Sequence, residues 1–378
     1  MRLLRIRSGI AWAIKTALFV VLAALLLAGC GLPGTISSGG SLPVTKPIPT
    51  ATPLPPVRFP QDEAPHSNLT EWWYYTGHFH SASGHEYGFE LTLFQTLRGS
   101  LAPYYAAHYA ISDISRGQFH YDQQIGFGSP DSIPPAGSTQ GFHLALNGWT
   151  LTGLNGHDQL HAAMTDYAIN LTLTDALPHP VLHGGSGLIS YGVGGFSYYY
   201  SRPLMRVSGT MIDHGAAIPV TGQAWMDHQW GNFLGLGGSG WDWYSIQLAN
   251  HTEYMLYIIR DSQKRPLSVV GTYVAADGSV HEIQAANLRF SVLGHWTSPA
   301  TGGVYPSGWQ VTISSPALTL TLAPALRDQE LVTAQSTGVA YWEGAVRISG
   351  RANGAAVTGQ GYVELTGYVN LPSNAATP

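Results

Sequence analysis

Alternating apolar and polar positions dominate the chain from about residue 57 onward, and they predict β-strands rather than helices. Residues 72–80 and 86–96 alternate on either side of a Ser-Ala-Ser-Gly turn, which predicts an antiparallel hairpin. Asn-Gly or Asp-Gly pairs at residues 155–156, 277–278 and 353–354 are strong signals for further hairpin turns. The remaining predicted strands are residues 104–112, 142–146, 150–154, 160–163, 167–174, 197–201, 204–211, 223–228, 244–248, 254–260, 268–274, 284–292, 309–314, 318–322, 339–349 and 359–368.

A glycine-rich segment, residues 231–240, separates this pattern into two runs of strands. Short strands with turn residues between them are typical of barrels and sandwiches. The sequence therefore predicts an all-β protein with two domains, residues 58–232 and 233–372.

The first 57 residues have a different composition. Residues 1–29 contain four basic residues and then a short apolar run, as in a secretory signal peptide. That run is shorter than the roughly 20 residues that a membrane span needs. It ends in Leu-Ala-Gly before Cys30, which resembles a bacterial lipobox and implies that Cys30 is acylated. Residues 30–57, rich in Gly, Ser and Pro, then read as a flexible tether. We therefore expect a protein that is lipid-anchored in the cell envelope, on the extracytoplasmic side of a bacterial membrane.

Cysteine count and charge narrow the possibilities further. Cys30 is the sole cysteine, so an intramolecular disulfide is excluded. The chain has 17 basic and 22 acidic residues, and removal of residues 1–29 would leave 13 basic ones. Nucleic acid is therefore not an expected partner, because phosphate binding requires a basic surface.

The most distinctive chemistry lies at residues 222–231 and 241–248, which contain four tryptophans, two aspartates and a histidine. In a strand, Trp225, Asp227 and Gln229 share one face and Met226, His228 and Trp230 the other. A carboxyl group among aromatic rings loses hydration and keeps its proton to a higher pH, which suits a general acid. The alternative is a tryptophan-rich core with solvated carboxylates at strand ends. Asp242, directly after the glycine-rich segment, is expected at a turn or on the surface.

A second aromatic run covers residues 71–80. Alternation places Glu71, Trp73 and Tyr75 on one face, and His78 and His80 on the other. The two histidines have the spacing of a strand-borne metal pair, but no third ligand stands out near them. We therefore predict neither a metal ion nor a cofactor.

Other enzyme signatures are missing from the sequence. It has no Gly-x-Ser-x-Gly nucleophile elbow, no Walker loop and no His-Glu-x-x-His motif.

Several motifs in the same order resemble the lipocalin-like family of AttH proteins and carotenoid 1,2-hydratases (hydroxyneurosporene synthases). They are the segments 71–77 (EWWYYTG), 87–94 (YGFELTLF), 225–231 (WMDHQWG), 241–243 (WDW), 341–344 (YWEG) and 361–368 (GYVELTGY). The resemblance implies two consecutive lipocalin-like antiparallel β-barrels and a hydrophobic ligand such as an isoprenoid or polyene. It also implies that Asp227 matches the proton donor of the hydratases. Trp225 stands where those enzymes are expected to carry tyrosine, so the chain is closer to the AttH branch, which is linked to transport systems.

Two functions follow as expectations. One is the binding and cofactor-independent hydration or isomerisation of an alkene; the other is a non-catalytic lipid carrier that works with an ABC-type transporter. A purely structural lipoprotein is a third possibility. The predicted catalytic residues are Asp227, Trp225 and Tyr244. The predicted ligand-binding residues are Glu71, Trp73, Tyr75, Gln229, Trp230, Trp241 and Trp243.

Overall fold

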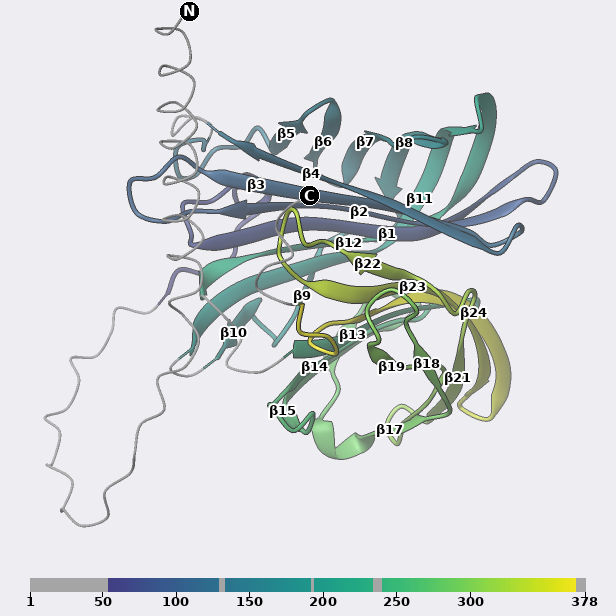
Figure 1. The fold of residues 1–378 in the computed structure, drawn as a ribbon. Coiled ribbons are helices and arrows are strands. Elements are labelled where there is room, and N and C mark those ends of the chain that lie inside the picture. The colour runs from purple at the N-terminus through teal and green to yellow at the C-terminus, as the bar shows by residue number, and fades with distance from the viewer. Residues whose placement is uncertain (1–53, 129–132, 192–193, 234–239, 372–378) are drawn as a thin grey trace, which may run out of the picture. The chain divides into compact units, whose positions relative to one another are not determined.

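A computed structural model describes residues 54–128, 133–191, 194–233 and 240–371. The described residues from Pro56 onward form one compact unit built from antiparallel strands (Figure 1). The strands of the first sheet are β1 (Thr70–Ser81), β2 (Glu86–Thr96), β3 (Tyr104–Asp113), β4 (Gln118–Phe127), β5 (Phe142–Leu146), β6 (Trp149–Leu154), β7 (His157–Ala163), β8 (Tyr167–Asp175), β9 (Val181–Leu182), β10 (Leu188–Ser190), β11 (Gly195–Asp213) and β12 (Ala216–Phe233).

The first sheet is a nearly closed barrel. Its strands follow the order β4-β3-β2-β1-β12-β11-β8-β7-β6-β5, and β9 and β10 also pair with β11. Its two end strands, β4 and β5, lie close together. The Asn147 side chain in the β5–β6 turn donates hydrogen bonds to Gln124 Oε1 (3.0 Å) and to the Ile125 carbonyl (3.1 Å), both on β4. The first and last long strands, β1 and β12, pair along their whole shared length.

The second sheet repeats this strand pairing, in which the first long strand pairs with the last. Its order is β16-β15-β14-β13-β24-β23-β21-β20-β17, with β22 on β23, and its first strand β13 pairs with its last strand β24. Its strands, with the separate hairpin β18–β19, are β13 (Gly240–Leu248), β14 (Glu253–Arg260), β15 (Pro266–Val274), β16 (Val280–Glu282), β17 (Leu288–Val292), β18 (His295–Thr297), β19 (Val304–Pro306), β20 (Trp309–Ile313), β21 (Leu318–Pro324), β22 (Glu330–Val332), β23 (Ala340–Ala352) and β24 (Ala355–Leu365). The predicted all-β fold is therefore confirmed, as a nearly closed antiparallel barrel followed by a second antiparallel sheet.

The predicted hairpins form where the turn residues indicated. Asn155 and Gly156, and likewise Asn353 and Gly354, have positive φ angles, which an Asn-Gly turn between two strands requires.

Some predicted strand limits are wrong. Residues 197–201 and 204–211 are not two strands but parts of the single strand β11, whose register shifts between Arg202 and Met205, around Pro203. The predicted strand 284–292 begins with a 3₁₀ turn, η4 (Ala285–Asn287), before β17. Strand β4, which carries polar residues at many positions, has no counterpart in the prediction.

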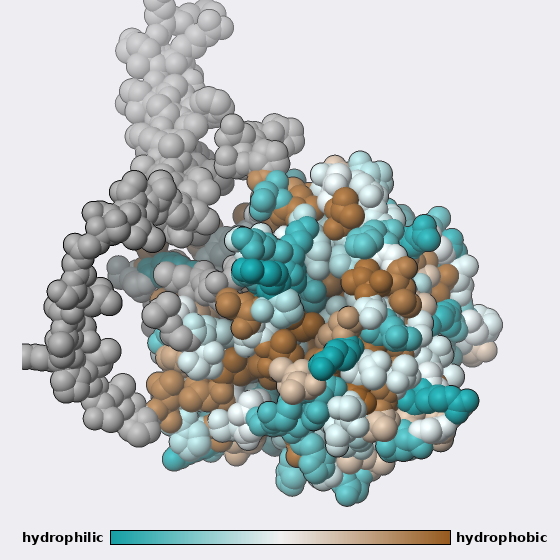
Figure 2. Space-filling model, turned by 90° about the horizontal axis from the view of Figure 1, so that it is seen from below, coloured by the Kyte–Doolittle hydropathy of each residue, from teal (hydrophilic) through white to brown (hydrophobic). Residues whose placement is uncertain are grey.

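Three large groups of buried side chains stabilise the sheets, beside a small cluster of Ala110, Leu331 and Tyr341. The first barrel encloses one group, which includes Trp73, Tyr75 and Trp230, and the second sheet encloses another around Tyr244 and Trp309. A third group, the inter-sheet layer, lies where the two sheets pack together. Its buried members are Tyr74, Ile189, Tyr199, Trp225, Phe233, Trp243, Met255, Tyr257, Ile259, Ala345 and Tyr362. Outside these cores, hydrophobic groups interrupt a largely hydrophilic face on the side of the second sheet (Figure 2).

Residues 1–29, Cys30 and most of the tether lie outside the described residues, as do residues 234–239 at the predicted domain boundary. The first sheet ends at Phe233 and the second begins at Gly240. Within the described part of the chain, no helix is long and apolar enough to cross a membrane.

Candidate functional site between the two sheets

The alternation predicted for β12 is confirmed. Trp225 belongs to the inter-sheet layer, whereas Met226 and Trp230 belong to the core of the first barrel. Asp227 points to the same side as Trp225 and is 3% exposed. The carboxyl group therefore lies between the two sheets, away from bulk water.

Three side chains donate hydrogen bonds to Asp227. Trp225 Nε1 lies 2.6 Å from Oδ1, which also accepts from the Ser201 hydroxyl, and the Tyr199 hydroxyl lies 2.5 Å from Oδ2. Burial raises the pKa of Asp227 to about 7, although these three hydrogen bonds oppose the rise. Desolvation of the charged form outweighs the donors, so Asp227 exchanges its proton near neutral pH.

A chain of hydrogen bonds joins this carboxyl group to the second sheet. Trp243 Nε1, on β13, donates to the Tyr199 hydroxyl at 2.8 Å. The rings of Trp225 and Trp243 meet edge to face, with centroids 5.9 Å apart. Asp227 is therefore fixed by residues from both sheets.

Three glutamates add to the polar groups in this region: Glu90 on β2, Glu343 on β23 and Glu364 on β24. Glu343 and Glu364 are directly opposite in the register of β23 and β24. Like charges in such a cross-strand pair repel each other. This pair is therefore most stable when at least one carboxyl group is neutral.

The same glutamates favour their neutral forms. Burial, together with the charges of Glu364 and Glu90, raises the pKa of Glu343 well above its usual range. Burial also raises the pKa of Glu364 to about 8 and that of Glu90 to about 7. These three carboxyl groups are close enough to Asp227 for its charge to contribute to the raised pKa values of two of them, Glu343 and Glu364.

Two carboxyl oxygens of these three glutamates could accept further hydrogen bonds. Tyr74 donates to Glu343 Oε1 at 2.7 Å and Tyr341 lies 3.3 Å from Glu90 Oε1. The Oε2 atoms of Glu343 and Glu90 are buried, and no hydrogen-bond partner for them lies within the described ranges of the chain. A buried polar atom of this kind needs an explanation, and a catalytic role is one of the recognised explanations.

Only part of the predicted site comes together here. Trp225, Asp227 and Trp243 are in contact, and Trp241 Nε1 donates to Glu364 Oε2 at 2.8 Å. Gln229 shares the face of Asp227, but its amide donates to the Tyr191 and Ser197 hydroxyls.

The other predicted site residues lie in different cores. Trp73, Tyr75 and Trp230 are inside the first barrel, where Glu71 is also fully buried and contacts His228. Tyr244 lies in the core of the second sheet, against Trp309. Alternation explains the separation, because neighbouring residues in a strand point to opposite sides of the sheet.

Two expectations about single residues can be compared with the structure. Asp242 was predicted at a turn or on the surface; that is wrong, because it lies within β13 and its Oδ1 pairs with Arg260 Nε at 3.0 Å. His78 and His80, whose spacing alone would suit a metal pair, do not share a site: His78 Nε2 donates to the Gly361 carbonyl at 2.9 Å, whereas His80 is exposed.

Sequence reasoning missed Glu90, Glu343, Glu364 and Tyr199 as site residues. The three glutamates occur within motifs that already carried the family resemblance, which was the available signal. Their proximity depends on how β2, β23 and β24 pack across the two sheets, and strand alternation does not reveal that packing.

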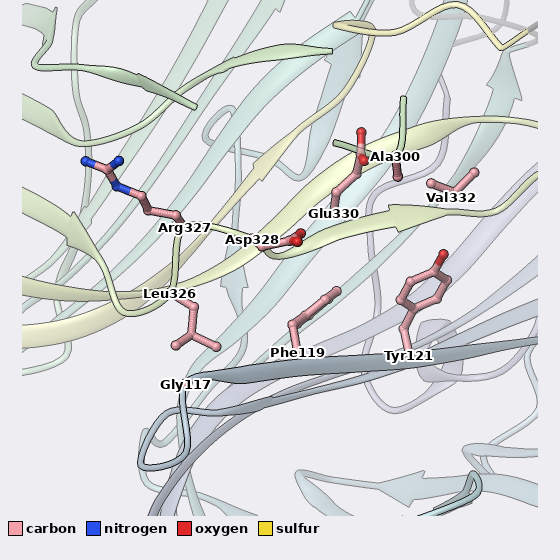
Figure 3. A pocket seen from close by; sticks show the side chains of 9 residues that line it. All are labelled: Gly117, Phe119, Tyr121, Ala300, Leu326, Arg327, Asp328, Glu330 and Val332. Carbon is pink, nitrogen blue, oxygen red and sulfur yellow. The ribbon is translucent and has the colours of Figure 1, made fainter. Parts of the chain in front are cut away.

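A cavity of about 470 Å³ opens elsewhere, between β4 and the segment that leads into β22. Phe119 and Tyr121 rise from β4 toward Leu326, Asp328 and Glu330 on the opposite segment (Figure 3). None of the catalytic or ligand-binding residues that the sequence predicted lines this cavity.

Comparisons with known proteins agree with this architecture. Residues 50–368 match the model of the family described as AttH-like. The crystal structure of an AttH candidate from Nitrosomonas europaea is 31% identical, with 84% of this chain and 99% of that chain covered and a TM-score of 0.74. Kievitone hydratase from Nectria haematococca shares the fold at 19% identity, with 85% and 95% covered and a TM-score of 0.66. No curated protein matches the chain.

Proposed function

This chain belongs to the AttH-like family, and we propose that it binds a hydrophobic isoprenoid, polyene or lipid between its two sheets and hydrates a C=C bond of that ligand. The observation that carries the proposal is Asp227, a carboxyl group that is buried beside Trp225 and whose pKa burial raises to about 7. The hydration reaction in the name of kievitone hydratase supports this choice of chemistry.

In the proposed reaction Asp227 is the general acid. Its proton adds to the less substituted carbon of the alkene, and the more substituted carbon becomes a cation. Water then adds to that carbon, and the proton released from the water returns to the Asp227 carboxylate. One alkene and one water thus give one alcohol, and the enzyme is restored.

Hydrogen-bond chemistry indicates which oxygen carries the proton. The indole N–H of Trp225 can only donate, so Oδ1 remains an acceptor. Oδ2 faces the Tyr199 hydroxyl, which can donate or accept, and a proton on Oδ2 is therefore compatible with this contact. The faces of Trp225 and Trp243 would stabilise the cation by cation–π attraction of about 1–2 kcal/mol per ring.

A lipid carrier is the second candidate, and the lipobox-like sequence before Cys30 favours it. In that function the inter-sheet layer holds the ligand unchanged, Asp227 is a polar anchor, and the acylated Cys30 keeps the protein on the extracytoplasmic face of the membrane. An ABC-type transport system would then supply or accept the ligand.

The test compares ligands recovered from the full-length protein and from Asp227→Asn by mass spectrometry of lipid extracts. Hydration predicts an alkene retained by the variant and the same compound, heavier by one water, from the parent. Loss of the acid should lower the rate by roughly 10²–10⁴. Recovery of one unmodified ligand from both proteins would establish a carrier, and absence of any apolar ligand from both would refute both functions.

Asp158→Asn is the matched control. Asp158 is also a buried carboxyl group whose pKa burial raises to about 7, but it accepts from Tyr75 inside the first barrel. If hydration depends on Asp227 specifically, this control keeps the activity that Asp227→Asn loses.

A further inference from the structure

Two histidines and a glutamate converge inside one end of the first barrel, on the side of β12 opposite Asp227. His66 precedes β1, Glu71 lies near the start of β1, and His228 lies on β12. His66 Nδ1 and His228 Nε2 each lie 2.8 Å from Glu71 Oε1. One ligand atom from each residue lies within 4.8 Å of the others. We propose that His66, Glu71 and His228 bind a divalent transition metal ion such as Zn²⁺.

The donor set matches this metal class. Zinc sites commonly combine imidazole nitrogens with one carboxylate, at about 2.0–2.2 Å from the ion. Donors arranged tetrahedrally around such an ion are about 3.3 Å apart. His66 Nδ1 and His228 Nε2 would thus each move about half an ångström from Glu71 Oε1 as the ion replaces their hydrogen bonds.

Each proposed ligand already has a partner on its other polar atom. His66 Nε2 lies 3.4 Å from Asp62 Oδ1, and His228 Nδ1 lies 3.2 Å from the Tyr200 hydroxyl. Glu71 Oε2 accepts from the His66 backbone N–H (2.8 Å) and from Gln95 Nε2 (3.1 Å). Outer contacts of this kind orient the ligands of metal sites and set the histidine tautomers.

Aromatic packing also fixes the two rings. The His66 ring stacks on Trp230 with centroids 4.2 Å apart, and the His228 ring stacks on Trp73 at 4.6 Å. The two ring nitrogens that face Glu71 are therefore held in place before an ion arrives, which reduces the entropy lost on binding. Each nitrogen releases the proton that it donates to Glu71 as the ion binds.

Charge and access distinguish this cluster from a similar one. His85, Asp113 and Asp213 also lie close together, but the Arg116 guanidinium already pairs with both aspartates. Among the residues that the structure describes, the ion-pair partners of Glu71 are the two histidines alone. The His66 and Asp62 side chains are 17% and 26% exposed, so an ion can enter from solvent on their side.

The ion would tie the segment before β1 to the paired strands β1 and β12. Three protein ligands leave a fourth tetrahedral position for water on the exposed side. This inference does not depend on the proposed hydration, because the metal cluster and Asp227 occupy opposite faces of β12.

The experiment is a titration of the metal-stripped full-length protein with Co²⁺, followed by its visible absorption and by displacement with Zn²⁺. Tight binding of one ion per chain, with a rise in Tm on adding Zn²⁺, is expected. His66→Gln should weaken Co²⁺ binding at least about tenfold and abolish the Zn²⁺-dependent rise in Tm. No binding to the parent, or equal binding to His66→Gln, would overturn the proposal.

His85→Gln is the matched control, because His85 is also partly exposed and paired with a carboxylate. It should bind Co²⁺ as the parent does, and an equal loss of binding in this variant would contradict the assignment. If His66→Gln fails to fold, Asp62→Asn replaces it. This outer contact should weaken binding roughly tenfold, whereas unchanged affinity would count against the site.

Discussion

Glu364 shows how one partly buried side chain makes stability depend on pH. Burial, opposed by the hydrogen bond from Trp241 and reinforced by the charges of Glu90 and Asp227, raises its pKa from 4.5 to about 8. Below pH 4.5 the group is protonated in both the folded and the unfolded chain. Between pH 4.5 and 8 the unfolded chain releases this proton while the folded chain keeps it, so the stabilisation falls as pH rises.

We therefore expect Glu364→Gln to become more stable relative to the parent as the pH rises. The amide has the shape of the neutral acid and can still accept from Trp241. The free energy of unfolding in urea should favour the variant by at least about 1 kcal/mol at pH 8, with a smaller or reversed difference at pH 5. A difference that does not change with pH would contradict the ionisation argument.

At this scale the sequence identified Asp227 and its neighbour Trp225 as partners, because strand alternation places residues two apart on one face. It could not connect Asp227 with Tyr199, Glu343 or Glu364, which depend on strand register and on packing between sheets. The sequence does not show strand register for the same reason. The spacing of His78 and His80 could therefore be considered for a metal site, whereas His66 and His228, which are far apart in the chain, could not be connected.

Strand β2 packs closely against the second sheet at Gly88. A Cβ atom on Gly88 would lie 2.5 Å from the Tyr362 hydroxyl and 2.8 Å from Ala345 Cβ. Both neighbours belong to the inter-sheet layer. A side chain at Gly88 would therefore push β23 and β24 away from β2.

Gly88→Ala should lower the free energy of unfolding by about 1–3 kcal/mol, the usual cost of overpacking. The double variant Gly88→Ala/Tyr362→Phe should recover part of this loss, because it removes the hydroxyl oxygen in the closest contact. Urea denaturation of the parent, both single variants and the double variant tests this. Additive effects without recovery would show that the contact is not the cause.

Most long strands could be predicted from alternation and from Asn-Gly turns, as the β1–β2 and β23–β24 hairpins show. Strand β4 could not, because its polar residues mask the alternation. The two strands predicted for residues 197–201 and 204–211 are one strand, β11, because its pairing with β12 continues past a bulge at Pro203, which has no N–H to donate.

In the whole molecule, the two sheets share hydrogen bonds along their contact. Besides the bond from Trp243 to Tyr199, Ser112 donates to Gln329 Oε1 at 2.6 Å and Gln247 Nε2 donates to the Ala224 carbonyl at 3.0 Å. Together with the aromatic inter-sheet layer, these hydrogen bonds hold the two sheets against each other, so that each sheet shields one face of the other from water.

We expect calorimetry of the full-length protein to show one cooperative transition for both sheets, with equal calorimetric and van't Hoff enthalpies. Gly88→Ala should shift that single peak to a lower temperature without splitting it. Two separate peaks in the parent would mean that each sheet is stable without the other.

The pairing of β1 with β12, and of β13 with β24, has a consequence for synthesis. The ribosome must synthesise the chain up to Phe233 before β1 can pair with β12. The first barrel therefore depends on contacts between residues far apart in sequence, and such contacts form slowly. Even then Tyr74, Trp225 and Tyr199 would face water until the second sheet has been synthesised. If synthesis paused after the first barrel, the nascent chain would expose an aromatic surface that is prone to aggregation. A chaperone that binds unfolded chains would be needed most at this stage.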